Sequence, residues 1–148
     1  VGQNLGANRP DRSERSVKIT SSINMILLSL VGLLFVLYPS FFVSLLTPDP
    51  EVVRAGAISL RIISIGFLAY GPGMVLIQAF NGAGDTYTPT LINFICFWII
   101  EIPLAYLLAL SLGMNEEGVY YAILFSESLL AGIAYLLFRR GRWKLKMV

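Results

Sequence analysis

Positive charge is concentrated at the two ends of this sequence, and the stretch between them is mostly apolar. Of the 11 Lys and Arg residues, all but Arg54 and Arg61 lie within residues 9–18 or 139–146. Apolar residues make up 56% of the chain and charged residues 14%, whereas a soluble domain averages about 45–50% and about 25%. Because cytoplasmic flanks of membrane proteins carry excess Lys and Arg, this distribution predicts a multi-pass membrane protein with both ends cytoplasmic and an even number of crossings.

Four apolar stretches are each long enough to cross a bilayer as a helix, which takes roughly 20 residues. We expect transmembrane helices at about residues 17–38, 52–80, 89–112 and 119–138. Residues 1–16 are predicted to hold the end of a preceding transmembrane helix and a cytoplasmic loop, and residues 139–148 a basic cytoplasmic tail. A soluble bundle would show polar stripes at helical spacing, which the first and third stretches lack. The predicted fold class is therefore an all-α integral membrane protein, and we expect the chain to be the C-terminal part of a longer protein.

Two prolines lie inside the predicted helices, Pro72 in the second and Pro103 in the third. Each removes one backbone donor, so the sequence predicts a kink at each position. A static kink is the simpler interpretation, because membrane helices tolerate proline. The alternative is that each proline marks a point where its helix bends during function. At the start of the third helix, Thr88 is expected to be the N-cap and Pro89 the first helical residue.

Three ionisable residues fall inside the predicted crossings, namely Arg61, Glu101 and Glu127. A charge at mid-bilayer costs about 2.5–3.5 kcal/mol on insertion scales, so it usually marks a function or a pair. Counted from the outer helix ends at about 1.5 Å per residue, all three lie roughly 15 Å deep, in one layer near the midplane. This layer is either a site for a cation, a proton or a charged substrate, or an Arg–Glu pair that locks helices together. Two acids against one base leave one carboxylate spare, which favours a function for at least one Glu.

Aromatic rings are available to such a site, but the usual catalytic groups are not. Five tyrosines could line a cavity for an aromatic cation, namely Tyr70, Tyr106, Tyr120, Tyr121 and Tyr135. For Tyr120 and Tyr121, a place in the aromatic belt at the membrane–water interface is the simpler interpretation. The sequence has no His and a single Cys, Cys96, within an apolar stretch, so it offers no metal cluster and no paired catalytic set. We therefore expect a protein that is not an enzyme, needs no cofactor and binds no nucleic acid.

Four landmarks of the sequence resemble those of the MATE multidrug efflux transporters, in family order and with family spacing. They are Val1-Gly2-Gln3-Asn4-Leu5-Gly6-Ala7, Asn81-Gly82-Ala83-Gly84-Asp85-Thr86 with Thr88-Pro89-Thr90, Pro103-Leu104-Ala105-Tyr106, and Arg139-Arg140-Gly141-Arg142-Trp143-Lys144. The resemblance implies a twelve-helix antiporter with two six-helix lobes, which exports drugs and organic cations across the plasma (inner) membrane in exchange for Na⁺ or H⁺. Four crossings would be helices nine to twelve of the C-terminal lobe. The implied partners are a small-molecule drug or organic cation, the lipid bilayer and the remaining N-terminal part of the same transporter.

The sequence departs from one branch of this family, and two alternatives stay open. That branch places an Asp in the tenth helix as part of a cation site, whereas the predicted helix at 52–80 offers only Arg61 in its interior. Either Glu101 or Glu127 replaces that Asp, or ion coupling occurs in the N-terminal lobe.

Two other functions are considered for the chain. A lipid-linked saccharide flippase of the same superfamily would need cationic residues in its cavity for phosphate, and only Arg61 qualifies. A membrane scaffold subunit without transport has little use for two unmatched acids in the membrane.

Overall fold

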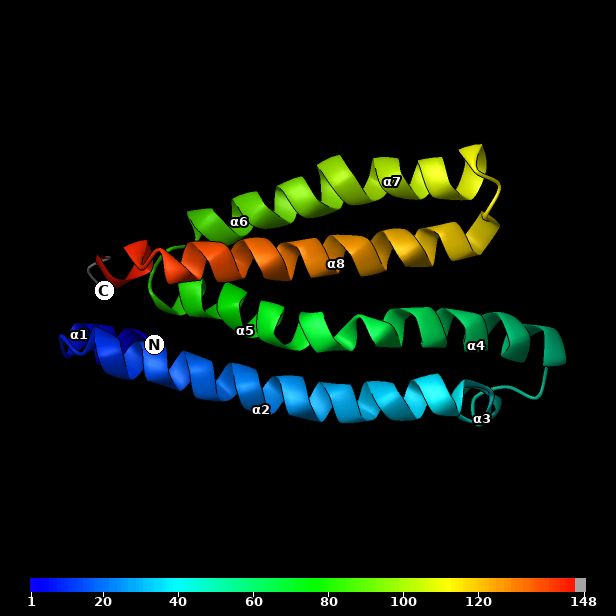
Figure 1. Cartoon of the computed structure of the whole chain (residues 1–148), viewed down its shortest axis with the longest axis horizontal. Helices are drawn as coiled ribbons and strands as arrows, with labels where there is room; N and C mark the ends of the chain where they lie inside the picture. The colour runs from blue at the N-terminus through cyan, green and yellow to red at the C-terminus, as the bar shows by residue number, and fades with distance from the viewer. Residues whose placement is uncertain (146–148) are drawn as a thin grey trace.

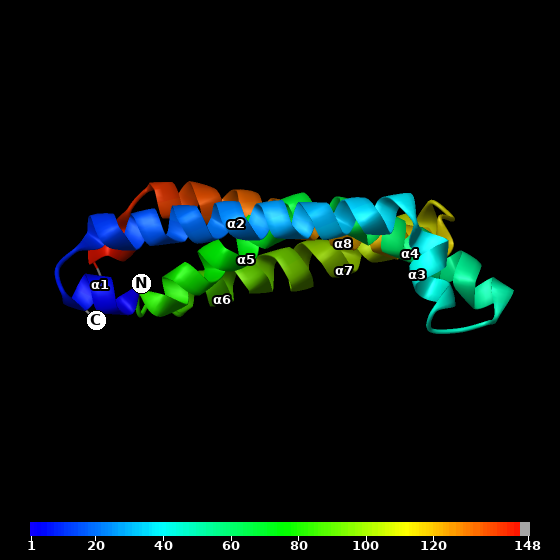
Figure 2. The same cartoon turned by 90° about the horizontal axis from the view of Figure 1, so that it is seen from below.

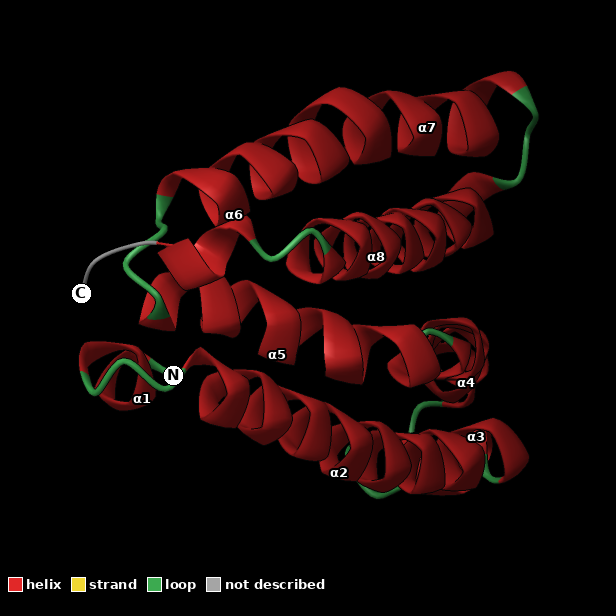
Figure 3. Cartoon of the chain, turned by 60° about the vertical axis from the view of Figure 1, so that its left-hand side comes forward, coloured by secondary structure: helices red, strands yellow, loops and turns green. Residues whose placement is uncertain are grey.

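The computed structural model describes residues 1–145, and every element in this range is a helix (Figures 1 and 3). The elements in chain order are α1 (Gly2–Gly6), α2 (Pro10–Leu37), α3 (Pro39–Ser44), α4 (Pro50–Ile65), α5 (Phe67–Gly82), α6 (Tyr87–Asn93), the π-helix η1 (Phe94–Glu101), α7 (Ile102–Tyr106), the π-helix η2 (Leu107–Ser111), α8 (Asn115–Arg139) and the 3₁₀-helix η3 (Arg142–Leu145). Residues 146–148, the end of the predicted tail, lie outside the described residues.

The long helices lie side by side and alternate in direction, which gives an elongated bundle with two distinct ends (Figure 1). One end holds α1, the start of α2 and the end of α8, and we call it the basic end after Lys18, Arg139 and Lys144. The other end holds α3 and the turn between η2 and α8, and we call it the acidic end after Glu51 and Glu116. Figure 2, seen from below, shows α2 running along almost the whole length of this bundle.

Three helices are each long and apolar enough to cross a bilayer: α2, the continuous helix Tyr87–Ser111 and α8. The pair α4 and α5 supplies a fourth crossing when it is taken as one broken span. On α2, the large apolar side chains of Ile23, Leu27 and Leu30 are more than half exposed, which suits contact with lipid. The prediction of an all-helical membrane protein is confirmed.

Helix α2 begins well before the predicted start of the first crossing. Residues 10–16, expected to lie in a loop, form its first two turns. Pro10 stands at the first helical position, where its missing N–H costs nothing, and Glu14 forms an ion pair of 2.6 Å with Lys18 one turn later. At about 1.5 Å per residue, the 28 residues of α2 rise about 42 Å, more than a hydrocarbon core of about 30 Å. The charged first turns therefore extend beyond the apolar part of the span.

The second crossing bends at Gly66, whereas the sequence predicted its kink at Pro72. Helices α4 and α5 meet there at an angle of 57°, and Figure 3 shows α4 turning away from the line of α5. The Gly66 N–H donates to the Ile63 carbonyl at 2.9 Å, a tight turn that ends α4. Just before it, the Ser64 hydroxyl donates to the Leu60 carbonyl, a side-chain bond that bends helices. Pro72 lies inside α5, which continues through it.

The third crossing is irregular around Pro103 rather than sharply broken. Pro103 is the second residue of α7, between the π-helices η1 and η2. Proline has no N–H to bond the preceding turn, and its ring crowds that turn. Wider hydrogen-bonded turns flank it, as in the bond of 3.0 Å from the Leu112 N–H to the Leu107 carbonyl. Single π turns in membrane and soluble helices are frequent at functional sites, and Glu101 is the last residue of η1.

Aspartate carboxylates accept hydrogen bonds from backbone N–H groups at the starts of α4 and α6. The Asp49 carboxylate accepts a hydrogen bond of 2.9 Å from the Glu51 N–H and so caps α4, as the Pro-Asp-Pro-Glu sequence leads one to expect. The Thr88 hydroxyl and N–H both donate to Asp85, at 2.8 and 3.3 Å. Thr88 was expected to be the N-cap, but it lies inside α6, whose N-cap is Thr86. The Asp85 carboxylate, one residue before that N-cap, accepts from the Thr88 N–H at the start of the helix.

Candidate intramembrane carboxylate site

The structure brings together two of the three ionisable residues predicted to form a layer. Glu101 at the end of η1 and Glu127 in α8 are close enough to interact electrostatically, and Cys96 of η1 lies within the same range of both carboxylates. Both glutamates are half-buried. They come from neighbouring helices, since α8 packs against η1 and α7. Two carboxylates on neighbouring helices thus lie within electrostatic range of one another inside the apolar part of the bundle.

Arg61, the third member of the predicted layer, lies apart from this pair. It belongs to α4, on the far side of the Gly66 bend, and its side chain is exposed. Within residues 1–145 it forms no ion pair with either glutamate. An Arg–Glu lock between the helices is therefore not present in the described chain, and the two acids are left without a basic counter-charge from it.

A cavity of about 280 Å³ lies beside Glu127. It is formed where the bend between α4 and α5 faces α8. Its walls are made by Ile63, Gly66, Phe67, Tyr70, Ile123, Leu124 and Glu127. A side chain at position 66 would crowd this wall, because a Cβ there would lie 2.9 Å from the Leu124 Cδ1 atom. The cavity therefore presents one carboxylate and one phenol in an otherwise apolar surrounding.

The two serines that flank Glu127 differ in their hydrogen bonds. Ser128 donates to the Leu124 carbonyl of its own helix at 2.7 Å, so it does not bridge helices. Ser126 is fully buried, and its hydroxyl has no hydrogen-bond partner within the described residues. A buried hydroxyl without a partner is costly and calls for an explanation.

The chemistry of the site follows from its donor set. Two half-buried carboxylates close together in an apolar surrounding repel one another, and a cation or a proton placed between them relieves that repulsion. Carboxylate and phenol oxygens are hard ligands, which suit a hard cation. Within residues 1–145, no group of three or more His, Cys, Asp or Glu residues could hold a metal ion.

Sequence reasoning found the two acids but not the wall around them. Tyr70 was among the tyrosines proposed to line a cavity, and it does line the one beside Glu127. The bend at Gly66 was not predicted, because the kink of this helix was expected at Pro72, six residues later. The signal that could have found it is the Ser64–Gly66 spacing, since Gly and Ser together are a recognised cause of helix bends.

Ionisable groups inside a helical membrane bundle are typical of membrane proteins with an ion or substrate pathway. Comparison with known proteins is consistent with that class. Residues 1–107 match the MatE family. The probable multidrug resistance protein NorM of Caulobacter vibrioides is 31% identical over 149 residues, covering 97% of this chain and 31% of that protein. The probable multidrug resistance protein YoeA of Bacillus subtilis is 25% identical over 150 residues, covering 100% of this chain and 32% of that protein.

The similarity also reaches plants. Protein DETOXIFICATION 49 of Arabidopsis thaliana is 22% identical over 147 residues, covering 99% of this chain and 29% of that protein. The family match covers more than half of the chain, so the chain belongs to the MatE family. It spans about a quarter to a third of the length of the curated relatives that it matches. The expectation of a MATE fragment is confirmed.

Proposed function

We propose that this chain is the C-terminal part of a secondary antiporter that exports drugs or organic cations in exchange for Na⁺ or H⁺. The observation that carries the proposal is the pair Glu101 and Glu127, two intramembrane acids without a basic partner within the described residues. Family membership and the names of the relatives, which include several multidrug resistance proteins, support the substrate class. The remaining helices of the transporter would complete the lobe around this pair.

In this proposal the acids and the adjoining cavity act as a binding site, and no covalent chemistry occurs. The coupling ion binds between Glu101 and Glu127, and a cationic drug uses Glu127 together with the Tyr70 ring, whose face attracts cations. Competition between the two cations for the same negative charge biases the equilibrium between two orientations of the cavity. The bend at Gly66 and the π-helical turns beside Pro103 are the points where the surrounding helices deviate from regular geometry.

We further propose that the basic end faces the cytoplasm of a cell bounded by the plasma (inner) membrane. Both clusters of Lys and Arg lie at that end of the bundle, and the acidic end carries Glu51, Glu116 and Glu117. Positive charge is retained on the cytoplasmic side of membrane proteins. An even number of crossings then returns both flanks to the same side.

The test is gradient-driven efflux of a fluorescent organic cation from proteoliposomes that contain the complete transporter. Imposed Na⁺ and H⁺ gradients are applied separately to the wild type, Glu101→Gln and Glu127→Gln. Glu116→Gln is the matched control, because it makes the same substitution at an exposed position in α8, the helix that carries Glu127. We expect efflux under one gradient, a loss of at least about tenfold in one or both test variants, and wild-type efflux in the control.

Two results would contradict this proposal. Wild-type efflux in both test variants would make the pair structural and move coupling to the rest of the transporter. Absence of efflux under either gradient, with correctly folded protein, would argue against a drug antiporter. Lipid-linked saccharides would then be the next substrates to assay.

A further inference from the structure

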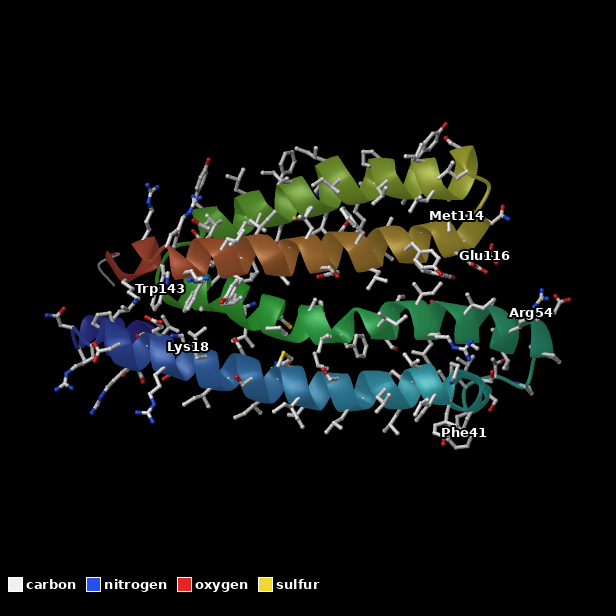
Figure 4. All side chains as sticks on the ribbon, viewed as in Figure 1. Lys18, Phe41, Arg54, Met114, Glu116 and Trp143 are labelled. Carbon is white, nitrogen blue, oxygen red and sulfur yellow. The ribbon has the colours of Figure 1, made fainter. Side chains whose placement is uncertain are left out.

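A second cavity lies at the basic end and not beside the glutamate pair. Its volume is about 790 Å³, and it is lined by residues of α2, α5, α8 and η3. Figure 4 labels Lys18, one of the residues that line this cavity, at this end of the bundle. The proposed transport site does not use this cavity, so its lining calls for a separate explanation.

Charge in the lining is unbalanced. Three cations line the cavity, Lys18, Lys144 and Arg139, and Glu14 is its one acid. The Glu14 carboxylate is shared, since it pairs with Lys18 at 2.6 Å and also with Lys144 of η3. The Arg139 guanidinium lies 5.8 Å from the centre of the Tyr135 ring, a contact that leaves its positive charge unneutralised. The lining therefore has an excess of two positive charges.

The cationic side chains of the lining are the groups that suit a phosphate. Lysine and arginine form short, charge-assisted hydrogen bonds to phosphate oxygens. Ser21 also lines this wall, but its hydroxyl oxygen is shielded from solvent. The cavity therefore offers a phosphate its excess positive charge.

The depth of the cavity distinguishes a lipid phosphate from a soluble one. The uncharged run from Ile19 to Leu37 rises about 28 Å at about 1.5 Å per residue, close to a hydrocarbon core of about 30 Å. Lys18 therefore stands at the headgroup level, and Arg139, which follows Phe138 in α8, stands at the same end. Further into the membrane the cavity wall includes Ser21 and Ser22 of α2 and the apolar side chains of Pro72, Leu76 and Phe138.

We propose that this cavity binds an anionic phospholipid. Its phosphate lies between Lys18 and Arg139, and its acyl chain follows Leu76 and Pro72 toward the membrane interior. Basic pockets between transmembrane helices are suited to such headgroups. Because the binding groups come from α2 and α8, and Lys144 ties η3 to the same place, a bound lipid joins the first and last crossings of the chain. The proposal does not depend on which solute is transported.

The experiment measures lipid binding to the complete transporter in detergent by native mass spectrometry. The protein is titrated with phosphatidylglycerol, with phosphatidylcholine as a zwitterionic lipid, and with inorganic phosphate as a competitor. We expect one phosphatidylglycerol to bind more tightly than phosphatidylcholine and to resist displacement by millimolar phosphate. In Lys18→Gln/Arg139→Gln its affinity should fall about 30-fold, since each basic residue near a membrane surface contributes roughly a factor of five.

Arg12→Gln/Arg15→Gln is the matched control, because it removes two charges at the same end from residues that are exposed and do not line the cavity. It should retain the tight lipid. The single variant Lys18→Gln is measured as well, in case the double variant does not fold. The Lys18 side chain is 69% exposed, so the substitution should leave the fold intact and weaken lipid binding about fivefold. Equal losses in the control, equal affinity for both lipids, or displacement by inorganic phosphate would each overturn the proposal.

Discussion

Gly73 of α5 lies so close to Ala131 of α8 that a Cβ atom at position 73 would be 2.8 Å from the Ala131 Cβ and 3.1 Å from its Cα. Carbon atoms in contact are normally about 3.5–4.0 Å apart. The approach therefore requires glycine, as is common where membrane helices meet through small residues. This contact packs α5 against α8 one helical turn from Glu127, since Ala131 follows Glu127 by four residues in α8.

Replacing Gly73 by Ala should therefore destabilise the complete transporter by about 1–3 kcal/mol, because the added methyl group overpacks the contact between α5 and α8. The measurement is thermal unfolding in detergent. Gly132→Ala is the control, since a Cβ at that helical position has nothing within 4 Å, and it should be neutral or slightly stabilising. A melting temperature for Gly73→Ala equal to that of Gly132→Ala would contradict the close contact.

The glutamate pair makes a prediction about additivity. If Glu101 and Glu127 hold one cation together, removing either charge destroys the site. The double variant Glu101→Gln/Glu127→Gln should then lose no more transport than the more impaired of the two single variants. Efflux rates of the three variants under the same ion gradient give the comparison. Losses that multiply in the double variant would show that the two carboxylates act at independent sites.

The two tryptophans are expected to behave in opposite ways. Trp143 is 1% exposed, and its ring stacks on Phe138 with centroids 4.7 Å apart, while its indole N–H donates to the Phe138 carbonyl at 3.0 Å. Trp98 in η1 is 67% exposed. Truncation of a buried aromatic costs about 3–5 kcal/mol, so Trp143→Ala should lower the melting temperature strongly and Trp98→Ala little.

Fluorescence distinguishes the same two residues without a stability assay. The experiment uses the complete transporter with every tryptophan outside this chain replaced by Phe. In lipids with brominated acyl chains, emission from its Trp143→Phe variant, which retains Trp98, should be quenched strongly. Emission from Trp98→Phe should be quenched weakly, because Trp143 is shielded by η3 and the end of α8. Similar quenching of both would mean that Trp98 is covered by another segment of the transporter or that Trp143 faces lipid.

Sequence reasoning found what depends on composition and charge along the chain. The crossings, the basic flanks and the intramembrane acids each follow from one local property, namely length of apolar run, excess of Lys and Arg, or a charged residue inside such a run. The Asp49 cap of α4 is local in the same sense, because the donor and acceptor are two residues apart. These features do not require knowledge of which helix faces which.

Features that depend on the rotation of one helix against another were not predictable. Equal depth suggested one layer for Arg61, Glu101 and Glu127, but depth along the membrane normal does not fix the direction in which a side chain points. The bend at Gly66 turns α4 relative to α5 and separates Arg61 from the acids. The bond between Lys144 and Glu14 joins residues from opposite ends of the sequence, and no local pattern announces it.

The topology makes a prediction that is independent of transport and lipid. Residues 1–148 contain a single Cys, Cys96, which is buried. In a background with Cys96→Ser and with every cysteine in the rest of the transporter replaced, one new thiol can be placed at either end of the bundle. Glu116 at the acidic end and Arg142 at the basic end are both exposed. A membrane-impermeant maleimide should label Glu116→Cys in intact cells, and should label Arg142→Cys only after the membrane is permeabilised, because clusters of Lys and Arg are retained on the cytoplasmic side of membrane proteins. Labelling of Arg142→Cys alone would invert the orientation. Labelling of both in intact cells would place the two ends on one side and contradict four crossings.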